Sequence, residues 1–104
     1  MKKNKTLNKT KVVRDSMGKI KIPSDVLYSA QTQRAIDNFP ISGIQFPIDF
    51  INAIIIIKRS SAITNNKLGL LNNIRKNAII KGCDKLLTGS YHKQFPVDVF
   101  QTGS

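Results

Sequence analysis

Two side chains in the sequence, His92 and Cys83, are of the kinds that act as bases or nucleophiles in enzymes. His92 is the only histidine, and it lies in a polar stretch where a general base would still need an orienting partner and a pocket. Cys83 has no activating neighbour in the sequence, and as the only cysteine it cannot form an internal disulfide. We therefore expect His92 to be a surface residue and Cys83 to be a small buried apolar one, which suits a reducing compartment.

No second catalytic pattern accompanies these two residues. The six acidic residues are all aspartates, and no pair of them has the spacing of a catalytic carboxylate pair. The sequence also contains no metal-ligand spacing and no glycine-rich phosphate-binding loop. We therefore predict no catalytic residue, no metal and no cofactor within these 104 residues.

The chain is strongly basic, with 17 Lys and Arg residues against 6 acids and a net charge of +11. Such a balance is typical of proteins that bind nucleic acid or anionic membranes. Residues 1–22 hold eight of these basic residues beside a single acid, and no aromatic residue interleaves the first eleven positions as a base-stacking surface would require. The most apolar run, residues 48–57, is far shorter than the roughly 20 residues of a membrane span. We predict a disordered basic tail over residues 1–11 and neither nucleic acid nor a membrane as a partner.

The pattern after this tail predicts a small hairpin and then a helix. Residues 12–25 alternate between polar and apolar positions on either side of a turn near Gly18, which is typical of two paired strands. Ser24 or Asp25 can cap a helix that follows. That helix is expected to end before Pro40, because proline disfavours helical geometry at the residue that precedes it.

Two longer helices are expected in the second half of the chain. One covers residues 47–67 and is terminated by Gly69, and the other covers residues 72–87 and is terminated by Gly89. The four isoleucines at 54–57 favour a strand by local propensity, but the segment is too long for one strand and its flanks continue a helical period. The sequence therefore predicts a mainly helical fold with a small β-hairpin near its N-terminus.

Five short stretches stand out together, in this order: residues 14–18 (RDSMG), 22–23 (IP), 28–34 (YSAQTQR), 38–43 (NFPISG) and 95–104 (FPVDVFQTGS). They resemble the opening motifs of the class II fumarases, members of the aspartase/fumarase superfamily, and the resemblance covers about residues 13–104. One departure is Ser29, which stands where the family has glycine. The resemblance implies the N-terminal, lyase-type domain of that helical fold over residues 12–104, and an expectation that this domain is truncated at its C-terminus.

The resemblance also assigns the one site residue that we predict. Ser104 matches the serine of the family's S-G-T turn, whose hydroxyl binds a substrate carboxylate. Thr102 and Ser104 follow the fumarase pattern, whereas aspartases carry Q-G-G-A-G-T at this place. Short hydroxyl donors on a tight glycine turn suit a dicarboxylate, because they lose little side-chain entropy on binding.

The implied activity is the reversible hydration of fumarate to (S)-malate, the lyase reaction of the tricarboxylic acid cycle, without metal or cofactor. The implied partners are fumarate and malate and, in the complete enzyme, three further subunits of a cytoplasmic homotetramer. The family's later catalytic regions have no counterpart in this sequence, so the chain alone is expected to be inactive. The alternatives are a non-functional gene remnant, an aspartase-type ammonia lyase and a basic nucleic-acid-binding module.

Overall fold

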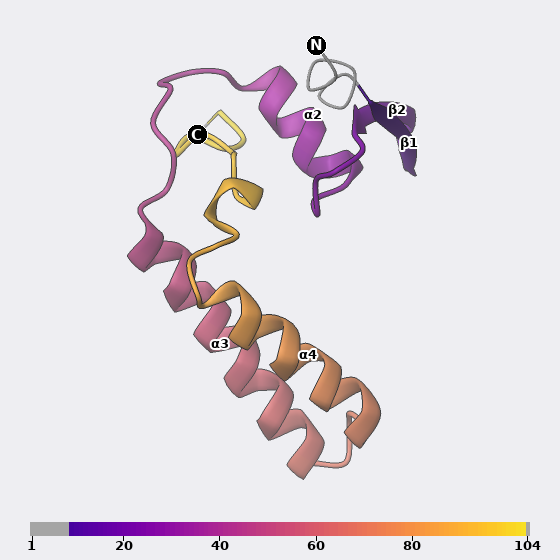
Figure 1. Cartoon of the computed structure of the whole chain (residues 1–104), viewed down its shortest axis with the longest axis vertical. Helices are drawn as coiled ribbons and strands as arrows, with labels where there is room; N and C mark the ends of the chain where they lie inside the picture. Colours follow the sequence, from indigo (N-terminus) through magenta and orange to yellow (C-terminus); the bar gives the residue numbers. More distant parts are fainter. Residues whose placement is uncertain (1–8, 104) are drawn as a thin grey trace. The chain divides into compact units, whose positions relative to one another are not determined.

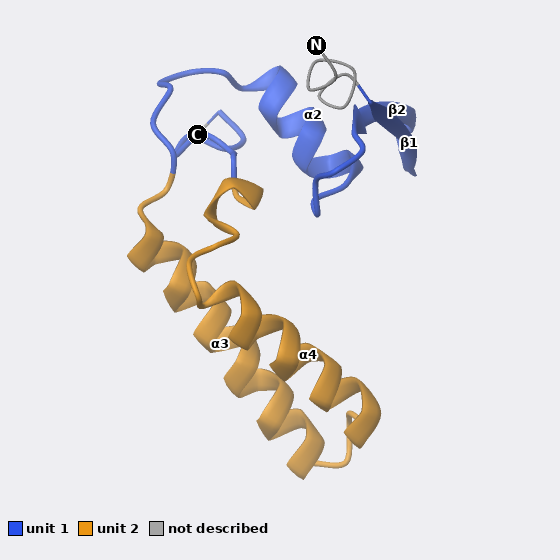
Figure 2. Ribbon diagram, in the orientation of Figure 1, with its two compact units in different colours: residues 1–45, 96–104 blue, residues 46–95 orange. Residues whose placement is uncertain are grey.

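The computed structural model describes residues 9–103 and arranges them as a hairpin, three α-helices and a short 3₁₀ helix (Figure 1). The chain divides into two compact units (Figure 2). Unit 1 joins residues 1–45 to residues 96–104, and unit 2 comprises residues 46–95. The prediction of a mainly helical chain with an N-terminal hairpin is confirmed.

The hairpin of unit 1 pairs strand β1, Thr10–Asp15, with strand β2, Gly18–Pro23. The strands are antiparallel, and Asp15 lies opposite Gly18, so the connection has two residues. Gly18 has a φ of 108°, a conformation that only glycine adopts without strain. Strand β1 begins two residues before the expected start at residue 12, and residues 1–8 of the predicted tail lie outside the described part of the chain.

The first helix begins later than the sequence predicts. Helix α2 is Ala30–Asn38, with Ser29 at its N-cap, whereas the expected start was Ser24 or Asp25. The reason is that the preceding backbone continues the hairpin instead of starting a helix. The Ser24 amide donates to the Lys9 carbonyl at 3.1 Å, one step beyond the end of β2.

Unit 2 is a pair of helices, α3 at Ile48–Lys67 and α4 at Asn73–Leu86, that lie side by side (Figure 1). Both predicted helices are confirmed, including the helical conformation of the isoleucine run. Helix α3 ends in a Schellman motif: the Leu70 amide donates to the Asn65 carbonyl, and the amide of Gly69, at φ 77°, donates to the Asn66 carbonyl.

The core of unit 2 lies between these helices. Ile51 and Ile55 of α3 and Cys83 of α4 are buried, at 7%, 5% and 4% exposure. The predicted burial of Cys83 is therefore confirmed. The side chains that pack around this centre are Phe46, Ile79, Leu86, Leu87 and Phe95. The opposite side of α3 remains apolar but exposed, so burial, and not polarity alone, distinguishes its two faces.

One position in α4 weakens the helix without a compensating contact. Gly82 lies in the middle of α4, and an added Cβ would meet no atom within 4 Å. We expect Gly82→Ala to raise the free energy of unfolding by about 0.5–1 kcal/mol, because glycine has more backbone freedom to lose in a helix. Denaturant unfolding of the two proteins checks this, and an unchanged or lower midpoint in the variant would contradict it.

Within residues 9–103 no helix is both long and apolar enough to cross a membrane.

Candidate functional site

The segment that precedes Ser104 is a sequence of tight turns, and its position is set by Asp98. The Gln101 amide donates to the Asp98 carbonyl at 2.8 Å, and the Gly103 amide donates to the carbonyl of Phe100. The Phe100 amide also donates to Oδ1 of Asp98 at 2.9 Å, a local turn that aspartate side chains commonly close. The carboxylate of Asp98 thus organises the turn from within.

The same carboxylate fastens this turn to the loop that follows α2. The successive amides of Ser42 and Gly43 donate to Oδ2 of Asp98 at 2.9 and 2.8 Å, and the Ser42 hydroxyl lies 2.8 Å from the same oxygen. Two consecutive amides that point at one oxygen form an anion-binding nest, which the φ of 73° at Gly43 makes possible. We call this arrangement of Ser42, Gly43 and Asp98 the Asp98 clasp.

The hydrogen bonds of the clasp stabilise the charged form of the carboxyl. Donation by the Phe100 amide is the largest effect that holds the pKa of Asp98 below its ordinary value of 3.8, and donation by Ser42 and Gly43 adds to it. Partial burial acts in the opposite direction but is outweighed. The clasp is therefore complete at neutral pH.

The other end of the turn passes close to an aromatic ring. Gly103 has a φ of 88°, and a Cβ added to it would lie 3.3 Å from Cε1 of Phe39. The backbone conformation favours glycine here, and an added Cβ would also crowd the ring. The turn of residues 98–103 is fastened at its start by the clasp, and it passes close to the Phe39 ring at Gly103.

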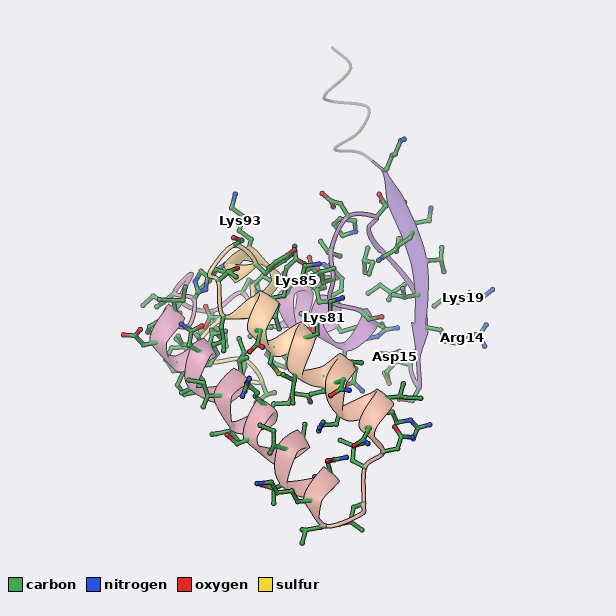
Figure 3. The ribbon with its side chains drawn as sticks, turned by 60° about the horizontal axis from the view of Figure 1, so that its bottom comes forward. Arg14, Asp15, Lys19, Lys81, Lys85 and Lys93 are labelled. Carbon is green, nitrogen blue, oxygen red and sulfur yellow. The ribbon has the colours of Figure 1, made fainter. Side chains whose placement is uncertain are left out.

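A parallel arrangement joins the hairpin to helix α2. The Nε of Arg34 donates to both carboxylate oxygens of Asp15, at 2.9 and 3.2 Å, and the Arg34 guanidinium also donates to the Gly18 carbonyl. The guanidinium of Arg34 is the main cause that lowers the pKa of Asp15 below 3.8. Figure 3 shows Asp15 on one face of the hairpin and its neighbours Arg14 and Lys19 on the other. The inward carboxylate thus fixes the helix against the strands.

We expect unit 1 to lose stability in acid. The pKa values of Asp15 and Asp98 are lowered in the folded state, so each contributes stability above its ordinary pKa of 3.8 and loses that contribution as the pH falls through its lower folded value. Thermal unfolding at neutral pH and at about pH 3 measures the loss. This acid-induced loss of stability should be smaller in Asp15→Asn than in the unaltered chain. In Asp25→Asn, which alters an exposed carboxylate, the loss should equal that of the unaltered chain. Equal losses in both variants would contradict this prediction.

A small hollow lies beside the clasp, but its chemistry does not suit an anionic substrate. Its volume is about 200 Å³. It is lined by Ile36, Phe39, Pro40, Gly43, Ile44, Gln45, Pro96 and Asp98. The only charged group in this lining is the carboxylate of Asp98, which would repel a dicarboxylate. The hollow is better described as the space between the two fastened loops than as a binding site.

The other residues singled out from the sequence lie elsewhere. Ser104, the predicted substrate-binding residue, falls outside the described residues. His92 is the first residue of the 3₁₀ helix His92–Gln94. It was predicted to lie at the surface, and the structure shows it only partly exposed. Its Nδ1 atom is buried without a hydrogen-bond partner. Among residues 9–103 no three His, Cys, Asp or Glu side chains are grouped so as to hold a metal ion.

The sequence did not identify Asp98 and Ser42 as partners, although both lie in motifs that carried the resemblance. The two residues are 56 positions apart, and no periodic pattern links them. One signal was available: an aspartate in an apolar stretch that leads into a glycine turn needs hydrogen-bond donors if it is even partly buried. The structure supplies these donors from the NFPISG loop.

Comparison with known proteins gives consistent results. Residues 18–104 match the family model described as Lyase. The class II fumarate hydratase of Prochlorococcus marinus subsp. pastoris is 50% identical over 91 residues, which are 88% of this chain and 20% of that protein. The class II fumarate hydratase of Halobacterium salinarum is 49% identical over 90 residues, covering 86% of this chain and 19% of that protein.

The fold agrees as well. The crystal structure of a recombinant class II fumarase from Schistosoma mansoni superposes with a TM-score of 0.86 at 35% identity, covering 91% of this chain and 20% of that one. This chain thus spans about a fifth of the length of the relatives it matches. The match over residues 18–104, the order of the motifs and the shared fold show that the chain belongs to the lyase family and, within it, resembles the class II fumarases.

Proposed function

We propose that this chain forms part of a fumarate hydratase, an enzyme of the tricarboxylic acid cycle that adds water reversibly to fumarate to give (S)-malate. The observation that carries the proposal is the 50% identity to a class II fumarate hydratase over 91 residues. It is supported by the two aspartate contacts in unit 1, because each joins two stretches that carried the resemblance. Asp15 holds residues of RDSMG to YSAQTQR, and Asp98 holds residues of FPVDVFQTGS to NFPISG.

In this proposal Ser104 binds the substrate. Its hydroxyl would donate a hydrogen bond to a carboxylate of fumarate or malate, next in the chain to a turn that the hydrogen bonds of Asp98 fasten. When malate is dehydrated to fumarate, a base removes the proton next to a carboxylate, the charge moves onto that carboxylate, and the hydroxyl group then takes up a proton from an acid and leaves as water. A donor placed at the carboxylate lowers the energy of that charged intermediate. The proposed chemistry needs neither metal nor cofactor.

The proposed working form is larger than this chain. We expect residues 12–104 to act as part of an N-terminal domain in a homotetramer, located in the cytoplasm. The basis for a larger form is that the chain spans about 20% of the relatives it matches. The single cysteine, Cys83, suits a reducing compartment.

We expect the isolated chain to show no measurable hydration of fumarate. A single carboxylate-binding hydroxyl cannot replace a base and an acid, which each contribute about 10²- to 10⁴-fold in rate. The measurement is the loss of the ultraviolet absorbance of fumarate with purified protein, and a mock purification from the same host is the control. Turnover above that control would contradict the expectation.

A grafted enzyme tests the proposal itself. The matched segment of the Prochlorococcus marinus enzyme, 91 residues, is replaced by the corresponding residues of this chain. We expect the graft to assemble like its parent and to hydrate fumarate within about tenfold of the parental kcat/KM, since a tenfold change corresponds to about 1.4 kcal/mol of transition-state energy. A graft that assembles like the parent but does not hydrate fumarate would contradict the proposed function.

A further inference from the structure

Helix α3 carries a second face with apolar side chains, and this face is exposed in the described chain. Its members recur at alternating intervals of four and three residues, as in the seam between two packed helices: Phe50, Ile54, Ile57, Ser61, Thr64 and the C-cap residue Leu68. The four apolar members are 49% to 66% exposed. We call these six positions the outer seam. The buried residues of α3 belong to a different face, so the helix has one apolar face more than α4 covers.

The outer seam contains a hollow of about 360 Å³. The hollow is lined by Ile56, Ile57, Ser60, Ser61, Thr64 and Asn65. Four of these, residues 57, 60, 61 and 64, stand at the spacing i, i+3, i+4 and i+7, so they are neighbours on one surface of the helix. Four such neighbours form the hole that receives one side chain of a facing helix. The short serine side chains at 60 and 61 leave this hole open.

A hydroxyl group within the outer seam does not need water as a partner. The Ser61 hydroxyl donates to the Ile57 carbonyl, one turn earlier in α3, at 2.8 Å. The single donor of this side chain is therefore used within the helix, and covering it with an apolar group leaves no donor unsatisfied. The hollow can thus be filled by an apolar side chain at little cost.

The charges around the outer seam restrict what can cover it. Unit 2 carries eight basic residues against two acids. Lys58 and Lys67 are exposed and stand next in the chain to Ile57 and Leu68, and neither lysine forms an ion pair among the described residues. A second copy of this basic unit would be repelled, whereas a partner with carboxylates at the margins of the seam would be attracted.

An anionic membrane would satisfy the charge but not the shape of this face. Helices that lie on membranes present a continuous apolar face to the acyl chains. Here the second half of the seam consists of hydroxyl side chains around a hollow, at Ser60, Ser61 and Thr64. A hole bounded by such small groups is suited to the close approach of another protein helix.

We propose that the outer seam packs against a helix of the part of a complete fumarate hydratase that this chain does not include. A large apolar side chain of that helix occupies the hollow, and acidic residues lie at its margins. About four fifths of the length of the matched relatives lies outside the match, so such an enzyme has ample chain to supply this helix. The inference rests on the proposed function, because that function requires the larger form.

The first test compares the reactivity of a thiol in the seam before and after assembly. Ile57→Cys is prepared in this chain and in the grafted enzyme, and labelling by N-ethylmaleimide is followed by peptide mass spectrometry, which separates it from Cys83. We expect labelling to be at least about tenfold slower in the graft, because a covered side chain reacts only when the contact opens. Ile74→Cys, at an 82% exposed position of α4 outside the seam, is the matched control and should react equally in both. Equal rates for Ile57→Cys in an assembled graft would overturn the inference.

The second test fills the hollow. In this chain Ser61→Leu should leave the midpoint of urea unfolding unchanged, because the added atoms enter open space. In the graft the same change should lower the assembled fraction by about tenfold, since it overpacks a filled hole. Asn77→Leu, at an exposed position of α4, is the control and should assemble like the graft. Normal assembly of the graft with Ser61→Leu would contradict the proposed packing.

Two other occupants are tested with this chain alone. Elution volume on size-exclusion chromatography and sedimentation with phosphatidylserine vesicles are measured with and without Ile57→Ser. We expect the substitution to change neither. A dimer that Ile57→Ser dissociates would assign the seam to a second copy, and vesicle binding that it weakens would assign the seam to a lipid surface; either result would overturn the inference.

The outcomes separate this inference from the proposed function. If the graft hydrates fumarate but its Ile57→Cys thiol stays as reactive as in the isolated chain, the inference fails and the proposed function stands. If that thiol is protected in a graft that assembles but does not hydrate fumarate, the proposed function fails and the packing of the outer seam stands.

Discussion

In the grafted enzyme, Ser104→Ala should lower kcat/KM for fumarate by about 10- to 100-fold. The substitution removes one hydroxyl donor from a substrate carboxylate, and a hydrogen bond to a charged group is worth about 1.5–3 kcal/mol. Assembly and folding should be almost unaffected, because the substitution removes one small hydroxyl and changes no core volume. Steady-state kinetics of the hydration reaction, with size-exclusion chromatography of the same samples, measure both quantities.

The matched control is Ser90→Ala, which removes an identical hydroxyl from an exposed position in unit 2. It should retain the kcat/KM of the graft. If Ser104→Ala behaved like this control, the assignment of Ser104 to the substrate would be wrong. If Ser104→Ala failed to assemble, the serine would be a structural residue of the turn.

The second large effect concerns the stability of unit 2. We expect Ile55→Ala to lower its free energy of unfolding by about 2–4 kcal/mol, because a buried isoleucine loses its transfer energy and leaves a cavity beside Cys83. Urea unfolding followed by circular dichroism provides the measurement, and Ile55→Val should show a smaller loss of about 0.5–1.5 kcal/mol.

The same helix offers a matched control two residues along. Ile57 is 65% exposed, against 5% for Ile55, and the same change to alanine removes the same atoms. Ile57→Ala should change the free energy of unfolding of the isolated chain by no more than about 0.5 kcal/mol. A similar loss at both positions would show that the apolar surface of α3 is covered in solution, and that the assignment of its two faces is wrong.

Helices α3 and α4 could be predicted from the sequence because the residues that cap or terminate them stand where the helical repeat of apolar residues begins or stops. Asn72 caps α4 by accepting from the Arg75 amide at 2.8 Å, as an asparagine before an apolar period predicts. Gly69 supplies the left-handed residue that ends α3. The isoleucine run shows that length and flanking pattern outweigh local strand propensity when the two disagree.

Unit 1 was harder to predict because distant hydrogen bonds determine it. The start of α2 moves from residue 24 to Ala30 because the Ser24 amide and the Val26 carbonyl are engaged by the hairpin, through Lys9 and Lys11. The Asp98 clasp likewise joins residues that no local pattern connects. The motifs indicated which stretches matter, but the pairing of these stretches through one aspartate each is visible only in the folded structure.

The most direct measurement is the product that the grafted enzyme forms when fumarate is offered together with ammonium. We expect (S)-malate and no aspartate, identified by NMR of the reaction mixture, because Thr102 and Ser104 follow the hydratase pattern. The variant that carries Thr102→Gly with Ser104→Ala, the pattern of the aspartases, should form malate more slowly and is the matched control. Aspartate as the product, or a fully assembled graft that forms neither compound, would contradict the assignment of this chain to a fumarate hydratase.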